Sequence, residues 1–190
     1  MTDPFFFLAA VFALLAVPGP TNTLLAASGA TVGVRRSLRL VPAELAAYTL
    51  SIGVLIAALG PLMVRYPMAA AAAQLGIALY LLAAAVRFWA CGAHGEQRGV
   101  SARRVFVTTL INPKGLIFAL TIFPHEALAR AFALFALICV PVACGWIALG
   151  DRAGRLGGRF ATPRRVYRIT AAAHVVFAGL VANGALHALS

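Results

Sequence analysis

Long runs without a charged residue limit most strongly what this chain can fold into. The longest run, Pro4–Val34, has 31 residues, and the runs Leu45–Val64, Tyr66–Val86, Ala131–Gly150 and Ile169–Ser190 each hold 20 or more. About 20 apolar residues cross the hydrocarbon core of a bilayer as a helix. Only 11% of the residues are charged, whereas about 25% is usual for a soluble domain. The bilayer is therefore the expected solvent.

This pattern predicts an all-α integral membrane protein in which residues 1–190 form one transmembrane domain with about six helices. The expected spans are Phe5–Gly33, Leu40–Val64, Met68–Trp89, Val105–Pro124, Ala127–Gly150 and Val166–Leu189. The connections are short, so no separate soluble domain is expected. A transmembrane barrel does not fit, because its strands alternate polar and apolar residues in runs of about ten.

The basic residues predict how the spans are oriented. Thirteen of the sixteen Lys and Arg residues fall in the first, third and fifth connections, whereas the second and fourth hold only Arg65 and Arg130. Basic connections tend to stay in the cytoplasm, which puts both termini on the extracytoplasmic side. The net charge of +11 is accounted for by these connections, so the expected partner is the lipid bilayer and not a nucleic acid.

The first span is interrupted by AVPGPTNTLL, residues 16–25. Pro18 and Pro20 lack an N–H group and clash with the preceding turn of a helix, and Gly19 lets the backbone bend between them. Asn22 lies 13 residues from the cytoplasmic Arg35, which is about 20 Å along a helix. The break therefore falls near the middle of a hydrocarbon core about 30 Å thick.

The fourth span carries a second interruption, LINPKGLIF, residues 110–118. Pro113 ends the helix, Asn112 offers an amide, and Gly115 relaxes the backbone. Lys114 lies ten residues from the cytoplasmic Arg104, or about 15 Å along a helix. A positive charge is thus expected near the midplane as well.

The two breaks occupy the first helix of each three-helix half. An odd number of spans per half inverts the second half, so we expect a 3+3 inverted repeat with helices one and four interrupted. Interrupted helices at corresponding places in inverted halves indicate the midplane binding site of a transporter. The alternative is that the prolines merely kink the helices for packing.

Charges inside spans are costly and usually functional. Lys114 is expected to bind a substrate carboxylate. Glu44 is expected to bind an amine or to carry a coupling proton, unless its side chain reaches the cytoplasmic interface. Tyr48 lies one turn after Glu44 and therefore on the same helix face, where it would hydrogen-bond Glu44, line the path or pack.

Ten residues form the predicted substrate-binding site: Pro18, Gly19, Pro20, Thr21, Asn22, Glu44, Tyr48, Asn112, Pro113 and Lys114. The sequence has no nucleophile with a base, no phosphate-binding loop and no metal-ligand spacing, so no catalytic residues, metal or cofactor are expected, and the chain is not expected to be an enzyme. The three cysteines lack any CxxC spacing and are interpreted as packing residues.

PGPTNTLL in the first span and NPKGLIF in the fourth, with the six-span length and the basic connections, resemble the lysine-exporter and homoserine/threonine-exporter family of amino-acid efflux transporters. The resemblance covers the whole chain. It implies an all-helical carrier in the bacterial inner membrane that exports a small amino acid or related metabolite, driven by the proton or membrane gradient. It also implies functional roles for Pro18, Gly19, Pro20, Asn22, Asn112, Pro113 and Lys114.

Two other functions remain open from the sequence. The chain could export a solute that is not an amino acid, such as a cation or an amine. It could also be a non-transporting membrane subunit that packs against a partner. The small residues of Met68–Ala85 suit close helix contacts, including a homodimer.

Overall fold

The computed structural model describes residues 4–90, 100–124 and 127–156, together with positions 168, 171–172, 174–176 and 178–183. All of the secondary-structure elements in these residues are helices, as expected. The elements are α1 (Pro4–Ala16), α2 (Pro20–Val32), α3 (Val34–Ser37), the 3-10 helix η1 (Leu38–Leu40), α4 (Val41–Arg65), α5 (Pro67–Ala90), α6 (Ala102–Leu110), α7 (Pro113–Ile117), the π-helix η2 (Phe118–Ile122) and α8 (Leu128–Arg155).

Within the described residues, the stretches Val34–Pro61 and Leu128–Arg155 are long and apolar enough to cross a membrane. Each of two bent helix pairs adds a further candidate if it counts as one span. Two to four candidate spans indicate a multi-pass membrane protein. The expected third span corresponds to α5. The expected sixth span, Val166–Leu189, lies partly outside the described residues, which include the apolar helix His174–Asn183.

Both expected breaks are present. α1 and α2 are bent by 63° at their junction, and α6 is bent by 46° relative to the helix that follows it. The local cause is the same in each case: Gly19 and Asn112 are extended residues directly before a proline, and that proline opens the next helix. A proline disfavours the α conformation in the residue before it but fits the first position of a helix.

The fourth span also contains a π-helix that the sequence analysis did not predict. Phe123 N–H donates to the carbonyl of Phe118 at 2.8 Å, and the two residues are five positions apart, as in a π-helix. Such turns are rare and often occur near functional sites. In this chain, the π-helix joins α7 to a cluster of aromatic rings that includes Phe118 and Phe123.

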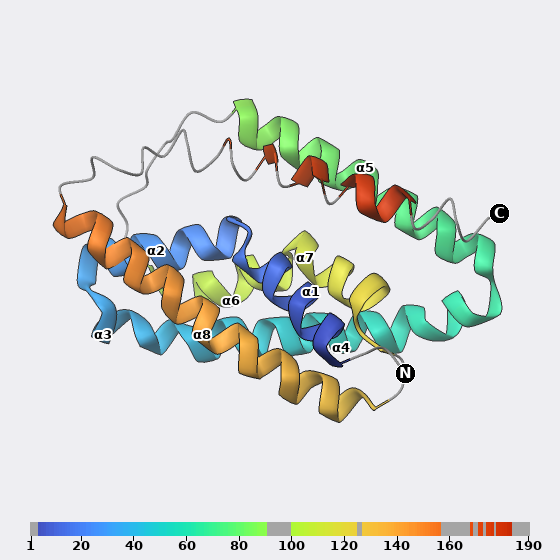
Figure 1. Ribbon diagram of the computed structural model, residues 1–190, viewed down its shortest axis with the longest axis horizontal. Coiled ribbons are helices and arrows are strands. Elements are labelled where there is room, and N and C mark those ends of the chain that lie inside the picture. Colours follow the sequence, from blue (N-terminus) through green and yellow to red (C-terminus); the bar gives the residue numbers. More distant parts are fainter. Residues whose placement is uncertain are drawn as a thin grey trace.

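The two broken helices run in opposite directions (Figure 1). α1 continues through α2 toward the end of the molecule that holds α3, and α6 continues through α7 away from it. α3, the start of α6 and the end of α8 lie at this same end, and they carry Arg35, Arg104 and Arg155. Each of the three basic connections therefore contributes at least one arginine to this end of the molecule.

α2 and α8 pack with their backbones in direct contact. A Cβ added to Gly150 would collide with the carbonyl of Ala26, and one added to Gly29 would collide with the carbonyl of Ile147. Small residues allow this approach between membrane helices, where close packing takes the place of the hydrophobic effect. The sequence predicted close helix contacts for Met68–Ala85 and did not indicate the contact between α2 and α8.

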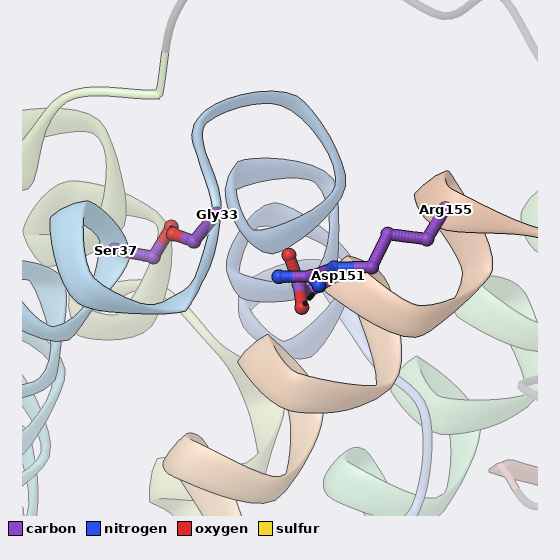
Figure 2. Close-up of polar contacts among 4 residues, drawn as sticks. All are labelled: Gly33, Ser37, Asp151 and Arg155. Carbon is purple, nitrogen blue, oxygen red and sulfur yellow. Dashed lines mark hydrogen bonds and ion pairs between the residues drawn. The ribbon is translucent and has the colours of Figure 1, made fainter.

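The chain turns sharply between α2 and α3. Gly33 has φ +81°, a left-handed conformation that glycine adopts without strain. Ser37 donates to the Gly33 carbonyl at 2.8 Å, and Asp151 of α8 lies next to the turn and pairs with Arg155 at 3.0 Å (Figure 2). The turn is thus fixed against the end of α8.

Two substitutions on α8 test the contact between α2 and α8. Gly150→Ala should lower the free energy of unfolding by about 1–3 kcal/mol, because the new methyl group overlaps the α2 backbone. Gly145→Ala is the matched control, since a Cβ there meets no atom within 4 Å, and it should be neutral or stabilising. Thermal unfolding of the purified protein measures both. Equal midpoints for the two variants would contradict the close packing.

Candidate functional site

The side chain of Lys114 connects the two breaks. It comes from the first turn of α7 and is only 3% exposed. Its Nζ donates to the carbonyl of Val17 at 2.6 Å and faces the carbonyl of Leu15 at 3.4 Å. The lysine passes close to Gly19, where an added Cβ would lie 3.5 Å from Nζ, an ordinary van der Waals distance. The charge of the second broken helix therefore rests on the backbone of the first.

Asn22 binds the same two carbonyl groups from the other side of the break. Its Nδ2 donates to Leu15 and to Val17, at 2.8 Å in each case. α1 ends at Ala16, so these carbonyls lose the partners that a continuing helix would supply. Buried carbonyl groups need partners, and two side chains supply them.

A second set of hydrogen bonds joins the breaks through Asn112. Its Nδ2 donates to Thr21 Oγ1 at 3.1 Å and to Tyr48 Oη at 3.4 Å, and its Oδ1 accepts from the backbone N–H of Lys114 at 3.1 Å. Thr21 Oγ1 also bonds Thr109 Oγ1 at 3.0 Å. α2, α4, α6 and α7 thus share one buried polar network.

Glu44 adds a negative charge to this network but has no ion pair with Lys114. The carboxyl group is 2% exposed, and its Oε2 has no hydrogen-bond partner. Glu44 and Lys114 lie close enough for their charges to interact, yet Lys114 Nζ donates to backbone carbonyls instead. The site therefore holds a buried acceptor without a donor.

Apolar side chains close the site toward both ends of the molecule. Toward the start of α1, aromatic rings pack edge to face, with centroids 5.5 Å apart for Phe7 and Phe123 and 5.1 Å for Phe118 and Phe135. Toward the basic end, the buried residues Leu25, Leu40, Val41, Val105, Ala143 and Ile147 form a second cluster. The polar network lies between these clusters.

A cavity of about 470 Å³ lies beside the second break, between α4 and the α6–α7 junction, and it is open to the surface of the molecule, where Leu50, Val54 and Ile111 are exposed. Its lining is aliphatic except for Ser51 and Asn112. A Cβ on Gly115 would lie 2.7 Å from Ser51 Oγ, so α7 and α4 approach closely at this point. The cavity offers an apolar volume that touches the polar network only at Asn112.

The predicted site residues fall into two groups. Direct hydrogen bonds link Thr21, Tyr48, Asn112 and Lys114. Asn22 joins Lys114 through the carbonyls of Leu15 and Val17 that both side chains bind, and Glu44 acts on Lys114 through its charge. Pro18, Gly19, Pro20 and Pro113 lie at the breaks, and they shape the backbone there rather than contributing polar side chains.

The prolines of the first break predict that backbone carbonyls nearby are freed. The sequence did not indicate that these would be the carbonyls of Leu15 and Val17 or that Lys114 would bind them, because such partners depend on tertiary packing. Sequence reasoning also missed Thr109, although that residue lies three positions before Asn112, a spacing that places two side chains on the same face of a helix.

Comparison with known protein families, with curated proteins and with solved structures gave no match. Among the described residues, no group of three or more His, Cys, Asp or Glu side chains could hold a metal ion. The function therefore has to be argued from the site itself.

The Thr21 hydroxyl provides a test of the network. Thr21→Val keeps the shape of the side chain but removes the acceptor of Asn112, so it should lower stability by about 1–3 kcal/mol, the cost of a buried unsatisfied group. Thr31→Val is the control, because the Thr31 hydroxyl bonds only carbonyls of its own helix, and it should change stability by no more than about 0.5 kcal/mol. Thermal unfolding of the two purified variants measures both effects. A Thr21→Val variant as stable as the Thr31→Val variant would contradict the network.

Proposed function

We propose that the chain is a secondary transporter that exports a small amino acid or related metabolite, driven by the proton or membrane gradient. In this proposal it resides in the bacterial inner membrane with both termini outside the cytoplasm. Six spans form a 3+3 inverted repeat of the lysine-exporter and homoserine/threonine-exporter type. The opposite directions of the two broken helices are consistent with such a repeat.

One observation carries the proposal: Lys114 of the second break bonds the Val17 carbonyl freed at the first break. Irregular backbone at membrane depth is tolerated only where protein or a watery cavity covers it. Simple kinks for packing would need neither a buried lysine nor a buried glutamate beside them. A binding site for a polar solute needs groups of both signs, and these residues supply them.

A zwitterionic substrate fits the charges of the site. Its carboxylate would pair with Lys114, and the first turn of α2, which has no side-chain cap, would favour the same negative group. Its amine, or a coupling proton, would pair with the unpartnered Oε2 of Glu44. An aliphatic substituent would enter the cavity beside Asn112.

Alternating access follows from the two apolar clusters that close the site. Opening the cluster around Leu25 and Ile147 would admit substrate from the cytoplasm, and opening the aromatic cluster around Phe118 and Phe123 would release it outside. One half rocking against the other around a fixed site would accomplish both steps.

Efflux measured in cells tests the proposal. Cells that express the chain are preloaded with a panel of labelled amino acids, and release is followed with and without an uncoupler. One solute should leave in an expression-dependent, uncoupler-sensitive manner. Lys114→Ala should slow its release about tenfold or more, because a charged hydrogen bond contributes about 1.5–3 kcal/mol. Arg130→Ala, on the exposed surface of α8, should leave it unchanged.

The absence of release for every solute in the panel would contradict amino-acid export. It would favour either a different transported solute or the interpretation as a membrane subunit. Equal release by the Lys114→Ala and Arg130→Ala variants would contradict the role of Lys114.

The role of Glu44 has its own test. Glu44→Gln removes the negative charge but keeps the shape of the side chain. Release of the exported solute should fall about tenfold, because 1.4 kcal/mol of lost binding free energy corresponds to a factor of ten. The protein should remain folded. Thermal unfolding of the purified variant checks the second condition. Unchanged release by Glu44→Gln would show that Glu44 binds neither the amine nor a coupling proton.

A further inference from the structure

The carbonyls at the end of α1 form a small, well-defined receptor. Leu15 and Val17 direct their oxygens at one point, where the Lys114 ammonium lies 3.4 Å and 2.6 Å from them. The Asn22 amide holds both oxygens at 2.8 Å. The C-terminal end of a helix also carries partial negative charge, and α1 ends here. These groups favour a compact cation that can donate hydrogen bonds.

A primary ammonium matches this receptor better than a bare metal ion does. Two carbonyl oxygens suit two N–H donors, whereas hard cations take about six or more oxygen ligands. The group that occupies the receptor in this structure is itself an ammonium.

Lys114 has a second acceptor within its electrostatic reach. Glu44 Oε2 is buried without a hydrogen-bond partner, and its charge interacts with that of Lys114. A buried carboxylate oxygen without a hydrogen-bond donor is costly. A state in which a donor reaches Glu44 Oε2 would remove this cost. The negative charge of Glu44 would still attract a lysine that had left the carbonyls.

We infer that the carbonyls of Leu15 and Val17 form the ammonium subsite of the transporter, and that Lys114 occupies it as a tethered substitute when no substrate is bound. The ammonium of the substrate displaces Lys114 from the subsite. Lys114 then pairs with the carboxylate of the same substrate, which leaves Glu44 with the second of the two roles proposed for it, that of carrying a coupling proton. One ammonium lies on the carbonyls in either state, so the local charge is conserved. This inference rests on the proposed export function and specifies a solute with a primary amine.

Chemical rescue of the full-length chain tests the subsite without any transport measurement. Lys114→Ala removes three methylene groups and the ammonium, and n-propylammonium has the size and charge of the part removed. Its addition should raise the thermal unfolding midpoint of purified Lys114→Ala saturably, toward that of the unsubstituted chain. Tetramethylammonium, which lacks N–H donors, and sodium at the same ionic strength should not raise the midpoint.

Ile117→Ala is the matched control, because it also opens space on α7 beneath a buried side chain but leaves Lys114 in place. Its midpoint should not respond specifically to n-propylammonium. Rescue of both variants, rescue by tetramethylammonium, or no rescue of Lys114→Ala would overturn the inference.

Lys114→Met covers the case in which Lys114→Ala does not fold. Methionine fills most of the lysine volume and leaves the carbonyl oxygens without their cation, so methylammonium should stabilise this variant and not the unsubstituted chain. The same shift in both proteins, or none in either, would overturn the inference. If n-propylammonium rescues Lys114→Ala but no amino acid is exported, the subsite stands and the proposed function is rejected. If an amino acid is exported but no rescue occurs, the proposed function stands and the subsite is rejected.

Discussion

A helix that is broken inside a membrane must find new partners for the backbone groups that the break releases. The carbonyls of Leu15 and Val17 find them in the side chains of Asn22 and Lys114. Because Lys114 belongs to the other broken helix, satisfying one break requires the second break to lie against it. The hydrogen bonds of Asn112 to Thr21 and Tyr48 follow from the same approach. The position of the site thus depends on a backbone requirement that the bilayer makes severe.

The packing around the breaks keeps this arrangement in register. Gly29 and Gly150 let α2 and α8 touch along their backbones, and Gly33 turns the chain next to Asp151 (Figure 2). At the opposite end, the π-helix brings the Phe118 ring against Tyr48 and Phe135. A polar network closed at both ends resembles one stage of an alternating-access cycle, in which each apolar cluster would act as a gate.

Much of this could be predicted from local sequence, because local rules govern it. Proline chemistry predicted both breaks within a few residues, and the charge-free runs predicted helices of membrane length. The distribution of arginines predicted which helix ends lie together, and α3, the start of α6 and the end of α8, which carry Arg35, Arg104 and Arg155, lie at the same end of the molecule. The hydrogen-bond partners of each polar group could not be predicted, because they depend on how helices distant in the chain pack together. Glu44 and Lys114 were expected to face one substrate, but nothing in their spacing indicated that Lys114 would bind backbone carbonyls. The π-helix and the contact between α2 and α8 likewise depend on tertiary packing rather than on a motif.

Disulfide formation between the two breaks tests the central claim most directly. With Cys91, Cys139 and Cys144 replaced by alanine, Thr21→Cys and Thr109→Cys are combined in a chain that carries a protease site between residues 91 and 99. The two hydroxyl oxygens lie 3.0 Å apart, so cysteine sulfurs at these positions point toward one another. Oxidation in membranes followed by cleavage should leave the two fragments joined on a non-reducing gel. Thr21→Cys combined with Thr108→Cys, one residue away, should give separate fragments. Separate fragments from both pairs, or joined fragments from both, would contradict the meeting of the two breaks.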